Sequence, residues 1–331
     1  MKVLVLGGAG YIGSHMVADL RARGVDVVVF DNLSTGHAVL AGNAPLVCLD
    51  VLDADALRAG FASHGPFDAV IHFCARSLVG ESVREPGLYY RNNLVGTLNL
   101  LDVMRETGHR RLVFSSTAAV YGIPQCTPIP EDHPTHPINP YGHSKLMVEQ
   151  VLSDHAAAFG IASVALRYFN AAGAHPDGGI GEWHEPETHL VPNALRAAFG
   201  GDQLQLFGDD YPTPDGTCVR DYVHVCDLAD AHWRAMGYLE RHDGAHVFNL
   251  GNGQGFSVRE VIDSAARVLG RPVPFTIRPR RIGDPPVLVA DASRARELLG
   301  WKPAWTSLDG IIASAVPFFR QVRHHAIVAN N

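Results

Sequence analysis

The sequence predicts an α/β protein with a doubly wound parallel sheet and a smaller C-terminal part. Short apolar runs alternate with helical stretches through the first half of the chain. Strands of a parallel sheet have helices on both faces and are therefore apolar along their whole length. After about residue 170 the loops lengthen and become rich in Gly, Pro and His. The second part is therefore expected to be smaller and to contain more loop.

The order of elements follows from the apolar spacing. The run Lys2–Leu6 predicts a first strand, the spacing from Tyr11 to Arg23 a helix, and the run 25–30 a second strand. Later strands are expected at 46–50, 69–75, 111–116 and 161–169, and helices at about 53–62, 88–107 and 141–158. Because 247–251 also has the composition of a sheet strand, the two parts are expected to interleave. We expect one domain over 1–170, with later elements near 224–251, and a second mainly over 171–331.

A glycine-rich turn directly follows the first predicted strand. Gly7, Gly10 and Gly13 are spaced Gly-x-x-Gly-x-x-Gly, and Asp31 ends the second strand 18 residues after Gly13. In a dinucleotide site the glycines allow a tight turn, a close approach to the pyrophosphate and close helix packing, and the acid binds the adenosine ribose. The pattern predicts a Rossmann-type site. No Arg or Lys occurs in 32–34, so NAD is favoured over NADP.

The carboxyl ends of the other predicted strands of this sheet carry mostly small and polar residues. Ligands of such sheets bind beyond the carboxyl ends of the strands, so we expect these residues to lie along the cofactor. They are Asp50, Val51, Phe73, Cys74, Ala75, Ser115, Ser116 and Thr117.

Tyr141 and Lys145 are four residues apart, behind Asn139 as a helix cap and Pro140 as a first helical residue. Positions i and i+4 share a helix face. Lowering a phenol pKa from about 10 to neutrality takes roughly 4 kcal/mol. A cation about 5 Å away supplies roughly 3 kcal/mol at an effective dielectric of about 20. The pair is therefore suited to a tyrosine base assisted by the charge of an oxidised nicotinamide, although neighbouring Tyr and Lys side chains also occur on helix surfaces by chance.

Composition limits the function classes. The 331 residues are 47% hydrophobic and 18% charged, with a net charge of −7 and no basic run, so nucleic acid is not an expected partner. No apolar run approaches 18 residues, so no membrane span is expected. The five cysteines are scattered, which favours a reducing cytoplasm. The 18 histidines are dispersed without recognised ligand spacing, and no metal site is expected.

Together these motifs resemble the extended short-chain dehydrogenase/reductase superfamily, and within it the family of UDP-glucose 4-epimerases. The resemblance runs from residue 1 to beyond 300. Its N-terminal motifs are Gly7 to Ser14 with Tyr11 and Ile12, Asp31-Asn32-Leu33, Val79 to Ser82, Asn92-Asn93, Ser115 to Thr117, Tyr121-Gly122, Tyr141 to Lys145 and Arg167-Tyr168-Phe169-Asn170. Its C-terminal motifs are Val219 to Val225, Asn249-Leu250-Gly251, Arg280-Arg281-x-Gly283-Asp284 and Leu299-Gly300-Trp301.

The resemblance implies a permanently bound NAD and a catalytic trio. Tyr141 would take the proton of the sugar 4-hydroxyl, Lys145 would tune the tyrosine and bind the nicotinamide ribose, and Thr117 would hydrogen-bond the reacting hydroxyl. Many relatives have serine at the threonine position, and a threonine hydroxyl has the same capacity. Further cofactor contacts implied by the motifs are Tyr11, Ile12, Asn32, Asn92 and Tyr168.

The resemblance also implies that the nucleotide is bound tightly and the sugar loosely, because the sugar must turn as a 4-keto intermediate. Arg220 and Arg281 match diphosphate clamps, although surface ion pairing would also explain them. The other implied substrate residues are Asn170, His189, Leu190, Phe207, Asp284 and Leu288. His189 stands where many relatives have asparagine, and Arg76-Ser77 where some have a lysine, so these two contacts are departures. Leu288 is either the wall beside the sugar 2-substituent or a core residue of a short strand.

Four alternatives stay open to different degrees. A nucleotide-sugar 4,6-dehydratase needs Asp-Glu after the threonine, where this chain has Ala118-Ala119. A UDP-pentose 4-epimerase is barely distinguished from a UDP-glucose enzyme. A UDP-N-acetylglucosamine 4-epimerase is less favoured, because Leu288 offers no hydrogen bond to an acetamide. A non-catalytic NAD-sensing regulator would be expected to lose the Tyr–Lys pair, which is present here. Homodimerisation is an expectation from the family alone.

Overall fold

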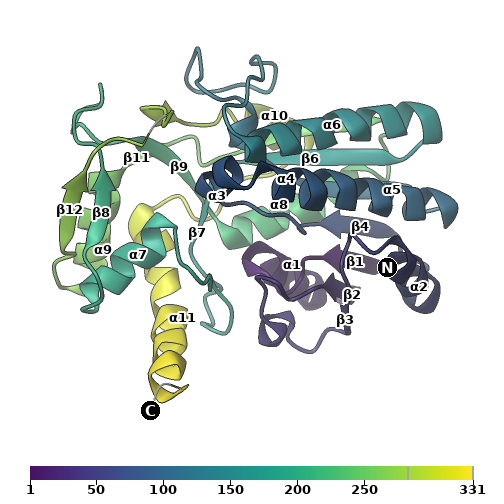
Figure 1. Cartoon of the computed structure of the whole chain (residues 1–331), viewed down its shortest axis with the longest axis horizontal. Coiled ribbons are helices and arrows are strands. Elements are labelled where there is room, and N and C mark those ends of the chain that lie inside the picture. The colour runs from purple at the N-terminus through teal and green to yellow at the C-terminus, as the bar shows by residue number, and fades with distance from the viewer. Residues whose placement is uncertain (282, 330–331) are drawn as a thin grey trace.

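The structure, a computed structural model, describes residues 1–281 and 283–329. A seven-stranded sheet and its helices form one side of the molecule, and the smaller part with helix α11 forms the other (Figure 1). Every strand of the large sheet is parallel to its neighbours, in the order β10-β6-β5-β4-β1-β2-β3. Its strands are β1 (Lys2–Leu6), β2 (Asp26–Asp31), β3 (Leu46–Cys48), β4 (Ala69–His72), β5 (Arg111–Thr117), β6 (Ala162–Tyr168) and β10 (Ala245–Leu250). The predicted fold class is confirmed.

The strand order reverses between β1 and β4. The chain first adds β2 and β3 on one side of β1, and then β4, β5, β6 and β10 on the other. Leu6 pairs with both Phe30 and His72, so the residues that follow these three strands lie at one edge of the sheet. A reversal of this kind opens a crevice beyond the carboxyl ends of the strands, where ligands of such folds bind.

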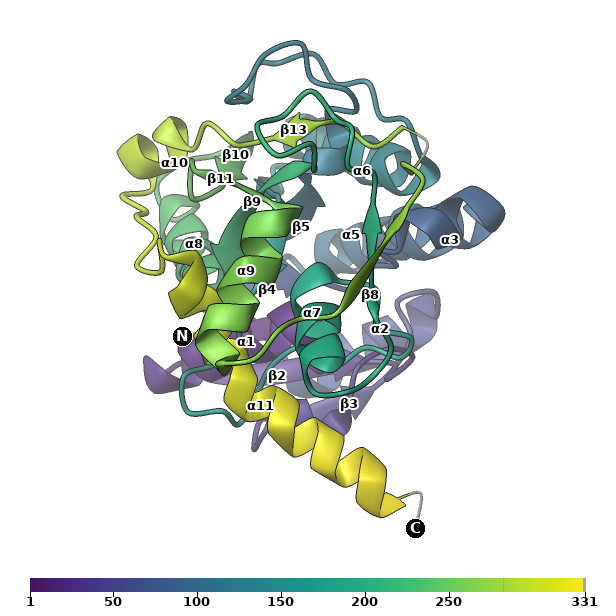
Figure 2. The ribbon, with the colours of Figure 1, turned by 90° about the vertical axis from the view of Figure 1, so that its left-hand side faces the viewer.

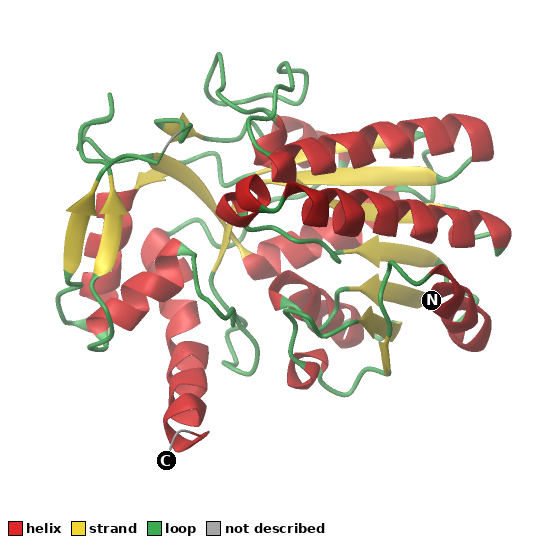
Figure 3. Ribbon diagram, in the orientation of Figure 1, coloured by secondary structure: helices red, strands yellow, loops and turns green. Residues whose placement is uncertain are grey.

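Helices cover both faces of the sheet (Figure 3). Apolar residues of α1 and α8 pack in one core cluster, and those of α2, α5 and α6 in another on the opposite face. These helices are α1 (Tyr11–Ala22), α8 (Val225–Tyr238), α2 (Ala54–His64), α5 (Gly96–Glu106) and α6 (Pro140–Phe159). The stretch expected as one helix over 88–107 is divided into the short α4 (Pro86–Tyr89), a π-helical turn (Tyr90–Val95) and α5, behind α3 (Val79–Arg84).

The smaller part contains two further sheets. The centre of the first sheet is β9 (Val219–His224), which pairs with β7 (Asn170–Ala172), β11 (Gly255–Ser257) and β13 (Val287–Leu288). The second sheet consists of β8 (Leu204–Phe207) and β12 (Phe275–Arg278). Helices α7 (Leu190–Ala198), α9 (Val258–Leu269) and α11 (Leu308–Ala329) pack beside them around one core cluster (Figure 2). Short helical segments at Ala38–Ala41, Ala118–Val120 and Ser293–Leu298 (α10) complete the chain.

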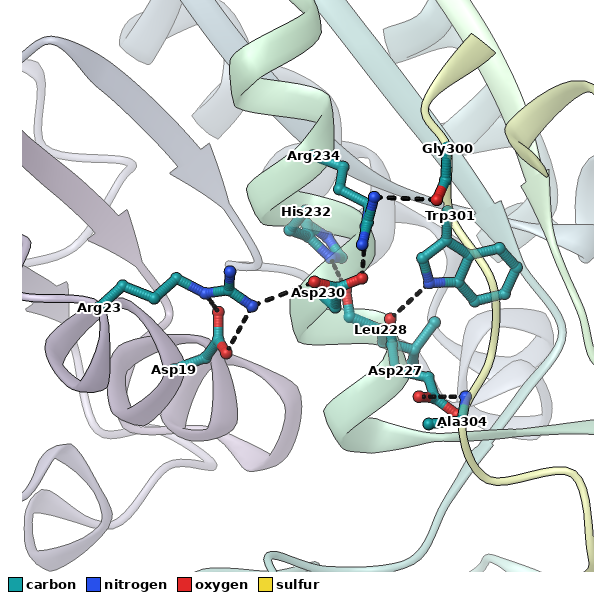
Figure 4. A network of polar contacts seen from close by, with 10 residues as sticks. All are labelled: Asp19, Arg23, Asp227, Leu228, Asp230, His232, Arg234, Gly300, Trp301 and Ala304. Carbon is teal, nitrogen blue, oxygen red and sulfur yellow. Dashed lines mark hydrogen bonds and ion pairs between the residues drawn. The ribbon is translucent and has the colours of Figure 1, made fainter. Parts of the chain in front are cut away.

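Later segments return to the large sheet. Strand β10 pairs with β6, and α8 packs against α1. A polar network fastens α8 on both sides (Figure 4): Arg23 of α1 donates to Asp230 over 3.0 Å, while Trp301 Nε1 and Ala304 N donate to the backbone and carboxylate of Asp227. The division of the chain at residue 170 stays a prediction. Among the described residues, no helix has the length and apolar character needed to cross a bilayer.

Candidate active site

The glycine turn has the geometry that close approach requires. Gly7 has a φ of +78°, and a Cβ at this position would lie 2.8 Å from the backbone nitrogen of Cys74. A Cβ on Gly13 would lie 2.0 Å from the carbonyl oxygen of Gly7. Gly10 caps α1 without a side chain, so the free N–H groups of this helix end face the edge of the sheet. This end of the helix is suited to bind a phosphate.

Asp31 lies at the end of β2, next to the turn. Its carboxylate is buried and accepts hydrogen bonds from the backbone nitrogens of Ala9 (2.9 Å) and Leu33 (2.8 Å). Burial raises the pKa of this carboxyl group, and the two hydrogen bonds oppose the rise. Asn32 in turn donates to Asp50 over 2.8 Å. The acid expected at the adenosine ribose is thus held in place by the glycine turn itself.

The other predicted cofactor residues follow the same edge. The register Thr117↔Tyr168 places the ends of β5 and β6 side by side, and the hydroxyls of Ser115 and Tyr168 are hydrogen-bonded. The Tyr11 hydroxyl donates to the carbonyl oxygen of Gly173 over 2.6 Å, which ties the turn to the smaller part. Val51 is buried, and Ile12 and Phe73 are partly buried against the core.

Asn93 holds the segment that follows β4. Its side-chain amide donates to the carbonyl oxygen of Arg76 and to the hydroxyl of Ser144, both over 3.0 Å. Its oxygen accepts from the backbone nitrogen of Arg76 (2.9 Å) and from the Asn92 side chain (3.0 Å). Ala75 lies in the segment so fixed. The Asn92-Asn93 pair was visible in the sequence, but its long-range partners were not.

Helix α6 begins as the sequence predicts. Asn139 accepts a hydrogen bond from the backbone nitrogen of Gly142 over 2.9 Å, and Pro140 is the first helical residue. Lys145 is 1% exposed and its ammonium donates to the carbonyl oxygen of Ser115 over 2.6 Å. Burial lowers the pKa of Lys145 to about 7. Lys145 is therefore fixed by the end of β5.

Tyr141 faces Thr117. Burial raises the pKa of the phenol, and a hydrogen bond with the Thr117 side chain partly opposes the rise. Burial is the larger of these two influences on the Tyr141 pKa, and the Lys145 ammonium is directed to the Ser115 carbonyl. The structure thus brings the three predicted catalytic residues together at the end of β5.

A buried ion pair under these residues was missed by sequence reasoning. Arg167 Nε donates to Glu149 over 3.0 Å, and Nη1 donates to the Tyr121 hydroxyl over 3.0 Å. Glu149 also accepts from the Ser116 hydroxyl. Both ion-pair side chains are less than a tenth exposed. Glu149 lies one turn after Lys145, so this network supports the catalytic face of α6.

The predicted substrate residues form a second group. Arg220 of β9 forms an ion pair with Asp284, and the Arg281 guanidinium lies 4.1 Å from the centroid of the Phe207 ring. Asn170 pairs with Tyr222 at the start of β7, beside Arg220. These contacts gather four of the predicted residues, although the Arg side chains are directed to protein groups.

Leu288 connects this second group to the catalytic end. It pairs in register with Arg220 and packs against the cluster that contains Ala118 and Val120, directly after Thr117. His189 and Leu190 stand at the start of α7, and the His189 ring is ion-paired with Glu182. The His189 ring is therefore directed to Glu182.

Comparison with known proteins identifies the family. The model of the NAD dependent epimerase/dehydratase family matches residues 3–251. A UDP-glucose 4-epimerase of Streptococcus mutans is 51% identical over 95% of this chain and 96% of its own length. The crystal structure of UDP-glucose 4-epimerase from Brucella ovis in complex with NAD has a TM-score of 0.93 and 50% identity, covering 96% of this chain and 98% of that one. That of the Bifidobacterium longum enzyme in complex with NAD+ and UDP has a TM-score of 0.92 and 41% identity, covering 97% and 98%. The chain belongs to the NAD dependent epimerase/dehydratase family.

Proposed function

We propose that this protein is an isomerase that interconverts UDP-glucose and UDP-galactose by NAD-dependent 4-epimerisation. The observation that carries the proposal is the placement of Thr117, Tyr141 and Lys145 together at the end of β5, beside the glycine turn. Relatives and structural neighbours that cover nearly the whole chain are UDP-glucose 4-epimerases, and some neighbours contain NAD or UDP. Ala118 and Ala119 offer no acid–base pair for a dehydration.

The residues at the edge of the sheet fit NAD. The backbone of the glycine turn and the N-terminus of α1 would hold the pyrophosphate, and Asp31 the adenosine ribose. Bound NAD supplies a reversible hydride acceptor for C4 of the sugar. The remaining cofactor contacts are those expected from the motifs: Tyr11, Ile12, Asn32, Asp50, Val51, Phe73, Ala75, Asn92, Ser115 and Tyr168.

Proton transfer would be the task of the trio. Tyr141 takes the proton of the 4-hydroxyl, and Thr117, which already hydrogen-bonds Tyr141, orients that hydroxyl. Lys145 holds the ribose side of the site and, when charged, stabilises the phenolate. The 4-keto sugar would then turn about its diphosphate link and take the hydride back on the other face of C4, while Tyr141 returns the proton to the 4-oxygen.

The nucleotide would be held by the second group of residues. Arg220 and Arg281 would bind the diphosphate, because guanidinium groups form paired hydrogen bonds with phosphate oxygens. Asp284 would bind the uridine ribose and Phe207 the uracil, with Asn170 and the His189-Leu190 backbone nearby. Leu288 would set the room beside the sugar 2-substituent. Pentose and N-acetylated UDP-sugars are therefore tested as alternative substrates.

The remaining expectations complete the proposal. We infer a cytoplasmic location, because all five cysteines are free thiols. A homodimer is expected from the family.

Turnover without added cofactor tests the function. The purified protein is expected to convert UDP-galactose to UDP-glucose without external NAD, and its denaturation to release NAD rather than NADP. A requirement for stoichiometric NAD would contradict a closed hydride cycle. Absence of any turnover would favour an NAD-sensing regulator.

A further inference from the structure

Four side chains with metal-binding atoms meet in the loop between β7 and α7. Glu182, His184, Glu187 and His189 each bring one imidazole nitrogen or carboxylate oxygen to within 4.8 Å of the others. Their sequence, Glu-x-His-x-x-Glu-x-His, spans only eight residues of irregular chain. This cluster was not predicted from the sequence, because the histidines match neither His-Glu-x-x-His nor another recognised ligand spacing. Here the turns of the loop bring the side chains together.

Three of the separations between these atoms match those of a tetrahedral site, whereas His189 Nδ1 and Glu182 Oε1 are hydrogen-bonded to each other. His184 Nδ1 lies 3.3 Å from Oε1 of Glu182 and 3.8 Å from Oε2 of Glu187. His189 Nδ1 lies 3.5 Å from Oε1 of Glu187. Bonds of about 2.1 Å to a central zinc ion place tetrahedral ligand atoms about 3.4 Å apart. The four groups therefore need only small movements to surround one ion.

The charge of the cluster favours a cation. The side chains of Glu182 and Glu187 are only 6% and 3% exposed, and two neighbouring buried carboxylates disfavour each other's charge. Among the described residues, neither carboxylate has a Lys or Arg ion-pair partner; the two imidazoles take that place. His184 Nδ1 is buried and makes no hydrogen bond within the described chain. A divalent ion would neutralise both carboxylates and engage this nitrogen.

We propose that Glu182, His184, Glu187 and His189 bind one divalent metal ion, with Zn²⁺ as the best match. Two imidazoles and two carboxylates suit zinc and related late first-row ions better than Mg²⁺, which prefers oxygen ligands in octahedral geometry. This site is separate from the trio at the end of β5. With His189 as a ligand, its side chain is not available to the nucleotide.

The ion has a structural role. His189 immediately precedes α7, so the ion fixes the loop to the start of this helix. The same loop contacts the cofactor half: Trp183 stacks on His37 with ring centroids 3.8 Å apart, and the His184 ring meets the edge of Tyr11 at 6.3 Å. The ion therefore stabilises the junction between the glycine turn and the smaller part.

Direct titration tests the site. The intact protein, with whatever cofactor it retains, is treated with a chelator, dialysed and titrated calorimetrically with ZnCl₂ and, separately, with MgCl₂. One equivalent of Zn²⁺ is expected to bind, without saturable Mg²⁺ binding over the same range. Co²⁺ is expected to give the intense visible absorption of a tetrahedral complex, which Zn²⁺ then removes.

Variants locate the ion. His184→Ala and Glu187→Gln are expected to lower the Zn²⁺ affinity at least about tenfold, the scale on which metal sites respond to altered ligands. His242→Ala is the matched control: it removes an exposed histidine that stacks on Tyr238 after α8. Zn²⁺ is expected to raise the melting temperature of the unmodified protein and of this control, and not that of His184→Ala.

Two results would overturn the proposal: no stoichiometric Zn²⁺ binding, or equal affinity in the unmodified protein and in His184→Ala. Either would leave the cluster as an ion-pair network of histidines and carboxylates. If the variants do not fold, the titration of the unmodified protein alone decides. None of these measurements depends on turnover, so failure of the proposed reaction leaves them unaffected.

Discussion

Charged side chains have different bonding partners at the cofactor end and at the nucleotide end of the candidate site. At the cofactor end, charged groups are buried and bonded to the backbone: Lys145 donates to Ser115, and Asp31 accepts from the glycine turn. At the nucleotide end, charged side chains are bonded to each other: Arg220 pairs with Asp284, whose side chain is 28% exposed.

This difference matches two kinds of binding. Groups that are already fixed lose little conformational entropy when a ligand binds, which favours a cofactor that stays in place. Because Arg220 is paired with a carboxylate that is itself partly exposed, a phosphate can replace this carboxylate as the partner of the guanidinium group. The comparison predicts that substitutions at the first end abolish cofactor binding or chemistry, whereas those at the second weaken substrate binding.

The largest effect is expected in the glycine turn. In Gly13→Ala the new methyl group would overlap the Gly7 carbonyl, so the turn must open and retained NAD should be lost. In Gly10→Ala the methyl group is 3.4 Å from the same carbonyl, so the fold should survive with weakened NAD binding. Gly237→Ala, in α8 with no atom within 4 Å of the new methyl group, is the control. The amount of NAD released on denaturation is compared among these three variants and the unmodified protein. Full retention of NAD in Gly13→Ala would contradict the assignment of the turn.

Tyr141→Phe tests the chemistry at the same end. Loss of the phenol removes the proposed base, so turnover should fall at least about 100-fold. Folding and NAD content should not change, because phenylalanine keeps the aromatic ring and removes only the hydroxyl that is bonded to Thr117. Turnover and released NAD are measured on one preparation. Near-normal turnover would exclude tyrosine as the base.

The fold was largely predictable from the sequence, because a parallel sheet has a local signature. The run Lys2–Leu6 became β1 with the same limits, and the polar residues after each strand met at one edge because the strands are in register. The division of the 88–107 stretch was not predictable, since a π-helical turn has no apolar spacing of its own.

The missed parts of the site are polar contacts between distant segments. Arg167 meets Glu149, and Arg220 meets Asp284, which is 64 residues away. Such pairs depend on strand register and on loop paths that single-segment patterns do not contain. The Tyr141–Lys145 spacing correctly predicted a shared helix face, but not that the ammonium is bonded to the Ser115 carbonyl.

Arg220→Ala tests the nucleotide end. Loss of a charge-assisted contact of about 1.5–3 kcal/mol should raise KM for UDP-galactose roughly 10- to 150-fold. Because this contact is present in both ground and transition states, kcat should change little. Arg280→Ala, which removes a neighbouring arginine paired with the exposed Asp210, is the control and should leave KM near normal. A fall in kcat at constant KM would place Arg220 in the chemistry instead.

The smallest effect is expected at Leu288, where the two ends meet. Its side chain packs beside Ala118 and Val120 and offers no hydrogen bond to an acetamide. A buried amide without partners loses about 1–3 kcal/mol, a penalty of roughly 5- to 150-fold. UDP-glucose and UDP-galactose should therefore be the main substrates, with weak turnover of UDP-N-acetylglucosamine.

Leu288→Ser should raise the activity on the acetylated sugar about fivefold or more, and Leu288→Tyr should abolish it, as measured by kcat/KM on both sugar classes. Because Leu288 is also part of a small core, the melting temperatures of both variants separate lost packing from altered selectivity. Equal efficiency on the two classes in the unmodified protein would show that Leu288 is a core residue and not a gate.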